Sequence, residues 1–120
     1  MTVTLVTLLK RRPDMTKADF IAKCEAQHRL IGERVLGGYA TRYSRRFLHP
    51  VDGADHDYDP DVLTEIDFPD EATRDACFAA MADPATMAMI MENEATLFDQ
   101  SRNHVFLVEE HVSDMPATKR

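Results

Sequence analysis

Apolar and polar positions recur along the chain with the spacings that distinguish strands from helices. Residues 3–9 form a short β-branched run with apolar side chains in both alternating registers, which predicts a strand buried on both faces. Apolar and polar residues alternate over residues 39–48 and again over residues 62–68, as they do in half-buried strands. A last strand is predicted over residues 103–112.

Capping residues and helical spacing predict three helices between these strands. Thr16 stands where a helix cap is expected, with an acidic residue three positions later, and a Gly-Gly pair ends the predicted helix over residues 17–36. A second helix is predicted over residues 70–82. Asp83 followed by proline is typical of a cap and a first helical position, so a third helix is predicted over residues 84–98.

The order of these elements is that of a ferredoxin-like fold. We therefore predict an α+β domain over residues 1–113, with a four-stranded antiparallel sheet and helices on one face, followed by a C-terminal tail over residues 114–120. The first and last predicted strands are apolar on both faces, so the face without helices also needs a cover. A second copy of the sheet is the simplest cover, and we predict a homodimer.

Composition and charge narrow the class of protein. The 120-residue chain is 44% hydrophobic and 29% charged, which fits one globular domain. Its net charge of −7 and its scattered basic residues disfavour nucleic-acid binding. No apolar run is long enough for a membrane span, and the basic residues 10–12 follow the first apolar run, whereas in a secretory signal they would precede it. With two cysteines, both in predicted helices, we expect a cytoplasmic protein with reduced thiols.

The first predicted helix carries a histidine on its apolar face. Phe20, Cys24, His28, Ile31 and Val35 recur at helical spacing and share the face that points toward the sheet. An imidazole titrates close to neutral pH, and burial favours its neutral, proton-accepting form. His28 is therefore a candidate general acid/base. The alternative is a core histidine that is hydrogen-bonded to a neighbour.

The last predicted helix places a carboxylate on its apolar stripe. Met87, Ile90, Glu94 and Leu97 recur at helical spacing. If the fold brings the helices together, Glu94 could pair with His28 and fix its tautomer. The alternative is a glutamate at the rim of the helix that is held by an arginine.

Aromatic side chains follow one face of the second predicted strand. Tyr39, Tyr43 and Phe47 would form a wall suited to a flat or apolar ligand, and Tyr43 could donate a hydrogen bond to a developing oxyanion. The alternative is that the row is simply part of the core. Cys24 invites a nucleophile interpretation, but a cysteine among apolar neighbours inside a helix is usually inert.

The acidic loop around residues 55–61 resembles a calcium loop only in part. Pro60 occupies the position that needs glycine for the turn, and Ile66 replaces the glutamate that would bind the ion through both oxygens. No metal site is predicted there. The sequence also lacks a glycine-rich phosphate loop, a nucleophile elbow and a paired-cysteine motif, so it predicts no nucleotide, flavin or zinc cofactor.

Two segments resemble the EthD-domain family. One is Leu-Lys-Arg-Arg-Pro-Asp-Met-Thr at residues 9–16 with the Phe20 and His28 that follow it, and the other is Glu-Ala-Thr-Leu-Phe-Asp-Gln-Ser-Arg at residues 94–102. With the last strand and Tyr43, the resemblance covers about residues 2–112. The family often has an aromatic pair where this chain has Lys23 and Cys24, and an aspartate in place of Asn93, so we expect a wider pocket.

The resemblance implies a ferredoxin-like protomer that dimerises sheet to sheet into an α/β barrel, with a pocket between sheet and helices in each protomer. Relatives include proteins of ether-degradation gene clusters, loosely linked to oxidoreductase activity, and fungal enzymes that dehydrate or decarboxylate polyketides. Similar dimeric barrels act as polyketide cyclases or cofactor-free quinol monooxygenases.

These observations lead to a functional hypothesis. The protein is expected to be a cofactor-free lyase, cyclase or oxidoreductase acting on a small apolar ligand, aromatic or polyketide-like, with His28, Tyr43 and Glu94 as catalytic residues. The substrate-binding residues are expected to be Tyr39, Phe47, Cys24 and Asn93. One alternative is a non-catalytic ligand-binding or accessory protein of a catabolic gene cluster, and another is a protein whose dimer is purely structural.

Overall fold

The computed structural model describes residues 1–119. A long helix near the N-terminus consists of three consecutive parts, of which the middle one is π-helical. The elements in chain order are β1 (Val3–Leu9), α1 (Lys17–Lys23), the π segment (Cys24–His28), α2 (Arg29–Leu36), β2 (Arg42–Phe47), β3 (Val62–Phe68), α3 (Glu71–Met81), α4 (Pro84–Ala95), a 3₁₀ turn (Gln100–Arg102) and β4 (His104–Leu107).

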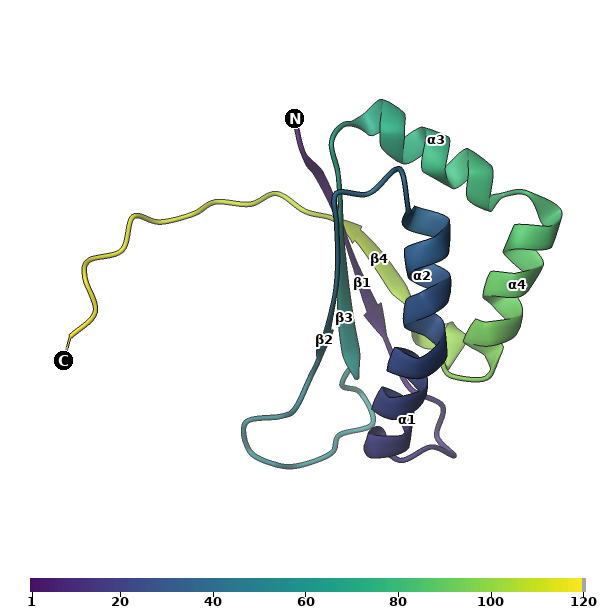
Figure 1. Cartoon of the computed structure of the whole chain (residues 1–120). Coiled ribbons are helices and arrows are strands. Elements are labelled where there is room, and N and C mark those ends of the chain that lie inside the picture. Colours follow the sequence, from purple (N-terminus) through teal and green to yellow (C-terminus); the bar gives the residue numbers. More distant parts are fainter. Residues whose placement is uncertain (120) are drawn as a thin grey trace.

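The four strands form one antiparallel sheet in the order β2-β3-β1-β4. All the helices lie on one side of this sheet, which is seen edge-on in Figure 1. This arrangement confirms the predicted α+β, ferredoxin-like fold. None of the helices within residues 1–119 combines the length and the apolarity that crossing a membrane requires.

Side-chain caps fix the starts of the helices where the sequence predicts them. The Thr16 hydroxyl accepts a hydrogen bond from the backbone N–H of Asp19 at 3.2 Å. At the start of α3 the carboxylate of Asp70 accepts from the backbone N–H of Thr73 at 2.7 Å, and at the start of α4 that of Asp83 accepts from the backbone N–H of Thr86 at 3.1 Å. Each cap satisfies one backbone N–H that the first turn of a helix leaves without a partner.

Two predicted strands are shorter than expected. The strand predicted over residues 39–48 begins only at Arg42, because the N–H groups of Tyr39 and Ala40 both bond to the carbonyl of Leu36 in the turn that ends α2. The strand predicted over residues 103–112 ends at Leu107, since the next backbone bond, to Thr4, reaches the start of β1 and leaves no partner strand beyond it. The helix predicted over residues 84–98 likewise ends at Ala95.

The chain after β4 runs away from the sheet as an extended segment, on the side opposite the helices (Figure 1). It contains no helix or strand between residue 108 and residue 119. The predicted tail over residues 114–120 falls in this segment, except for Arg120, which lies outside the described residues.

The hydrophobic core consists of two separate clusters. The first cluster lies near the C-terminal end of β1 and contains Leu9, Phe20, Cys24, Val62, Leu97 and Phe98. The second cluster lies toward the other end of the sheet and contains Leu5, Leu36, Phe68 and Cys77. Both cysteines are buried free thiols, one in each cluster, so they do not pair with each other.

A buried carboxylate ties the ends of β1, β3 and α1 together. Asp61 is only 1% exposed and accepts a hydrogen bond from the backbone N–H of Arg11 at 2.9 Å. The side-chain nitrogens of Lys10, Arg11 and Lys17 surround it at 3.5 to 3.6 Å. A buried charge needs such partners to offset its lost hydration, so this cluster anchors the start of β3 beneath the helix.

Candidate functional site

A hollow of about 270 Å³ lies between the sheet and the helices, where the two core clusters separate. The inward positions of the two central strands are large and apolar except at Thr7 and Thr64, which lie opposite each other in the register of β1 and β3. On the helix side, Gly32 lines the same space. The threonine side chains leave room that larger aliphatic residues would otherwise fill, and the absence of a side chain at Gly32 makes room for the Tyr43 ring.

His28 lines this hollow at the end of the π segment. Its Nδ1 atom lies 3.1 Å from the side-chain oxygen of Asn93, while the amide nitrogen of Asn93 donates to the side-chain oxygen of Gln27 at 3.3 Å. An amide oxygen can only accept, so in the neutral imidazole Nδ1 carries the proton and Nε2 keeps its lone pair. The imidazole is therefore oriented as a proton acceptor through Nε2.

The orienting contact differs from the predicted one. The sequence indicates that Glu94 could fix the tautomer of His28, whereas in the structure Nδ1 of His28 donates to Asn93, the preceding residue on α4. The edge of the imidazole also meets the ring of Phe98, with centroids 5.1 Å apart and an interplanar angle of 86°. Together these contacts hold the ring in one orientation.

The π segment is a feature that the sequence pattern did not predict. Its backbone bond from the N–H of Arg29 to the carbonyl of Cys24 spans five residues, where an α-helix spans four. Such a widened turn is locally less favourable and recurs at functional sites. Here the π segment ends at His28. It also carries Glu25, which pairs with Arg45 beside the Tyr43 ring.

Glu94 also lines the hollow, one residue after Asn93. Burial raises the pKa of this carboxyl group above its ordinary value, while the nearby His28 and a hydrogen bond from Gln100 work in the opposite direction. A carboxyl group with a raised pKa holds its proton closer to neutral pH and can act as an acid.

Tyr43 reaches the hollow from β2 and is packed against the helix at Gly32. A Cβ atom at Gly32 would lie 2.6 Å from Cε2 of the Tyr43 ring, so only glycine allows the ring this position. Burial raises the pKa of Tyr43 to about 12. The phenol is therefore neutral at physiological pH and available as a hydrogen-bond donor.

The Tyr43 ring also lies against an ion pair between Arg45 and Glu25. The guanidinium of Arg45 lies 4.9 Å from the centroid of the Tyr43 ring. The same guanidinium binds Glu25 through two hydrogen bonds, of 2.7 Å and 3.0 Å. This pair connects β2 to the π segment, so the positions of Tyr43 and His28 are linked through one set of contacts.

The structure thus brings three predicted residues together and leaves four outside the lining. His28, Tyr43 and Glu94 face one hollow. Phe47 and Cys24 pack with the first core cluster, Tyr39 packs against the second, and Asn93 contacts His28. Burial raises the pKa of the Cys24 thiol to about 12, which makes it a poor nucleophile. The roles assigned to these seven residues stay predictions.

Sequence reasoning missed Gly32, Thr7 and Thr64. Their signals are visible in retrospect: a glycine inside a helix with no capping role, and a threonine among the large inward side chains of each central strand. Only the register of β1 and β3, however, reveals that the two threonines are opposite each other.

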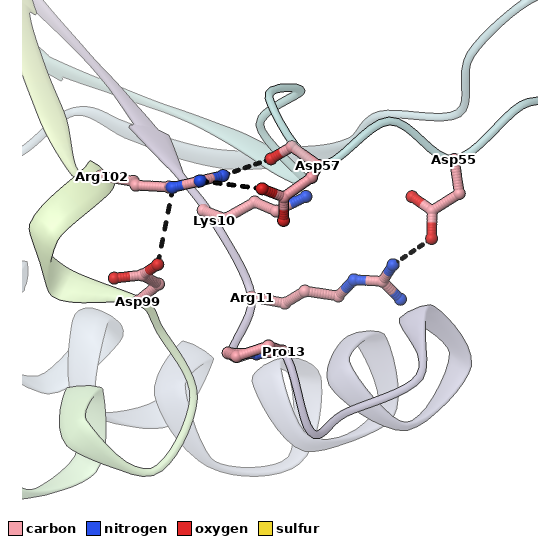
Figure 2. Close-up of a pocket in the computed structure, with 7 residues that line it drawn as sticks. All are labelled: Lys10, Arg11, Pro13, Asp55, Asp57, Asp99 and Arg102. Carbon is pink, nitrogen blue, oxygen red and sulfur yellow. Dashed lines mark hydrogen bonds and ion pairs between the residues drawn. The ribbon is translucent and has the colours of Figure 1, made fainter.

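A second hollow, of about 400 Å³, lies at the end of β1 and is lined by charged side chains (Figure 2). Its cations are paired: Arg11 binds Asp55, and Arg102 binds Asp57 and Asp99. These ion pairs fasten the loop between β2 and β3. The acidic loop residues are thus engaged with arginines, and residues 1–119 contain no group of three side chains that could hold a metal ion.

Comparison with known proteins identifies the family. The EthD domain model matches residues 12–101, and the chain belongs to this family. An ethyl tert-butyl ether D (EthD) family protein from Bacillus halodurans has a similar structure, with a TM-score of 0.64 and 14% identity over 92% of this chain and 100% of that chain. None of the curated proteins compared with the chain matches it.

Two further solved structures share the fold. A dimeric ferredoxin-like protein of unknown function from Thermobifida fusca has a TM-score of 0.62 and 11% identity, covering 90% of both chains. SnoaB, a cofactor-independent oxygenase from Streptomyces nogalater, has a TM-score of 0.56 and 14% identity, covering 93% of this chain and 95% of that chain.

Gly32→Ala should displace the Tyr43 ring, because the added Cβ would lie 2.7 Å from the phenolic oxygen. Alanine favours the helix by about 1 kcal/mol, so the variant should fold. If Tyr43 donates a hydrogen bond to a substrate, kcat/KM should fall on the order of 100-fold, the effect that a small misplacement of a reacting group can have. If the effect runs through Tyr43 alone, Gly32→Ala combined with Tyr43→Phe should be no worse than Tyr43→Phe; a further loss would contradict this account.

Glu94→Gln should raise stability in a pH-dependent way. Because burial raises the folded-state pKa of Glu94, wild-type stability falls as the pH rises from below the ordinary value of 4.5 through the raised value. Glutamine stays neutral, so the variant should be more stable than wild type at pH 7 and nearly equal to it at pH 4. Urea unfolding at both pH values measures this difference. Glu92→Gln, at an exposed position of α4, is the control, and a pH-independent difference at Glu94 would contradict the prediction.

Proposed function

We propose that this EthD-family protein is a small-molecule enzyme that transfers protons on an apolar, aromatic or polyketide-like substrate. The observation that supports it is the convergence of three proton-handling side chains, His28, Tyr43 and Glu94, from three different elements on one mainly apolar hollow. Such a hollow with a few polar groups is the usual form of a small-molecule site.

Each side chain has a role that follows from its surroundings. His28 accepts a proton through Nε2 from a carbon beside a carbonyl group or from a phenol. Tyr43 donates a hydrogen bond to the oxygen on which negative charge then develops. Glu94, which holds its proton more tightly than an exposed glutamate does, returns a proton to the intermediate or to a departing hydroxide.

This first step is common to the reaction classes considered. Enolate formation precedes loss of water in a lyase and ring closure in a cyclase, and a deprotonated phenol can react with dioxygen without a cofactor. The similarity of the fold to SnoaB, a cofactor-independent oxygenase, is compatible with the last of these. The buried free thiols fit a reducing compartment, and we propose a cytoplasmic location.

His28→Ala should reduce turnover by roughly 10²- to 10⁴-fold, the usual contribution of a general acid or base. A screen of the purified protein against aromatic acids and quinols, with product and thermal shift both followed, supplies the substrate for this test. His49→Ala, in the exposed loop, is the matched control and should keep full activity. A folded His28→Ala protein with full turnover would remove the catalytic assignment, while binding without any turnover by wild type would favour a ligand-binding or accessory role.

The proposal includes a homodimer formed through the face of the sheet that has no helices. Alternation along β1 directs Val6 and Leu8 away from the helices, opposite Phe106 of β4 and Leu63 of β3. Phe106 is 46% exposed although it is a large apolar side chain. An apolar sheet face of this kind needs a cover, and the fold neighbour from Thermobifida fusca is described as dimeric.

Val6→Lys should break this dimer, because it places a charge beside Phe106, in the apolar part of a face that continues to Glu65 on β3. Sedimentation velocity of the wild type should give twice the 13.6 kDa chain mass, and the variant should give the chain mass itself. Met91→Lys, at an exposed position of α4 on the helical side, is the control and should remain dimeric. A monomeric wild type, or a dimeric Val6→Lys protein, would contradict the arrangement.

A further inference from the structure

Two threonines form the floor of the hollow and have no assigned role. Thr7 and Thr64 lie opposite each other on the central strands and both line the hollow. Thr64 is only 6% exposed. Within residues 1–119, no hydrogen bond joins either hydroxyl to another side chain, and neither is among the fully buried side-chain atoms that lack a partner, so both hydroxyls reach the open space of the hollow.

A hydroxyl that opens into the hollow can form a hydrogen bond with a bound molecule. Valine has nearly the same shape as threonine but offers no hydrogen bond. The inward positions around Thr7 on β1 and Thr64 on β3 are otherwise occupied by Val, Leu, Ile and Phe. Two threonines facing each other at this level therefore indicate that a polar group of a bound molecule completes their hydrogen bonds.

The positions of the two threonines relative to His28 and Glu94 limit where the polar group of a bound molecule would lie. Thr7 and Thr64 belong to the sheet, whereas His28 and Glu94 come from the helices on the other side of the same hollow. A ligand between them would present one oxygen to the threonines and another part to the imidazole.

The volume of the hollow limits the size of the ligand. Its 270 Å³ corresponds to roughly nine water molecules at about 30 Å³ each, and so to on the order of ten non-hydrogen atoms. One or two rings fill this volume, and a larger compound would extend out of the hollow.

We propose that Thr7 and Thr64 form a binding subsite for a second substrate oxygen, and that the substrate is a one- or two-ring aromatic compound with a hydroxyl or carbonyl group apart from the reacting one. The inference rests on the proposed function for the identity of the reacting oxygen. The subsite itself depends only on the geometry of the two threonines.

Binding of 1-naphthol and of the dihydroxynaphthalenes, measured by calorimetry under nitrogen, tests the subsite. We expect wild type to bind at least one dihydroxynaphthalene about tenfold more tightly than 1-naphthol, because the second hydroxyl pairs with the threonines. Thr64→Val and Thr7→Val should lose this preference while keeping their affinity for 1-naphthol. Thr64→Ser, which retains the hydroxyl, should keep the preference, and the exposed Thr2→Val should behave as wild type.

Three outcomes would overturn the proposal. They are an unchanged preference in both valine variants, equal binding of the mono- and dihydroxy compounds by wild type, and no binding of any naphthol. His28→Ala separates the two proposals, since it should lose turnover but keep the preference for the second hydroxyl. If His28→Ala keeps full turnover while the valine variants lose the preference, the proposed function fails and the subsite stands.

Discussion

The hydrophobic core of this domain is interrupted at one level of its sheet, and the candidate site depends on that interruption. Above and below it, apolar side chains from strands and helices form two separate clusters. At the level between them the central strands present Thr7 and Thr64, and the helix presents Gly32. Core packing normally leaves few voids; the two threonines leave a hollow on the sheet side, and Gly32 makes room on the helix for the Tyr43 ring that lines it.

The contacts around this hollow determine how its polar side chains can form hydrogen bonds and, for Tyr43 and Glu94, the direction in which the pKa shifts. Asn93 places the proton of His28 on Nδ1 and leaves Nε2 as the acceptor. Burial keeps the Tyr43 phenol protonated and raises the pKa of Glu94. Three side chains that can exchange or share protons therefore line one mainly apolar space, although no two of them are neighbours in the sequence.

Local pattern predicts most of the fold but only part of the site. Caps such as Thr16 and the period of each strand are properties of adjacent residues, so the elements and their order follow from the sequence. The end of β4 at Leu107 depends on whether a partner strand is present, which a local pattern does not contain, whereas the start of β2 at Arg42 follows from the hydrogen bonds of the turn after α2. The contact between Asn93 and His28 joins helices that are far apart in the chain, and the residues of the π segment carry no pattern that distinguishes it from an α-helix.

The same difference between local pattern and long-range packing explains which site residues the sequence predicts. The inward faces of the helices identify His28 and Glu94, because helical spacing fixes which residues share a face. The aromatic row that suggested Tyr39 and Phe47 is divided between two core clusters, and only Tyr43 reaches the hollow. A crystal structure of the protein under xenon pressure tests the central claim most directly, because xenon enters empty apolar cavities. The account predicts xenon between the sheet and the helices, beside the imidazole of His28; a space filled by side chains, or an imidazole turned to solvent, would contradict it.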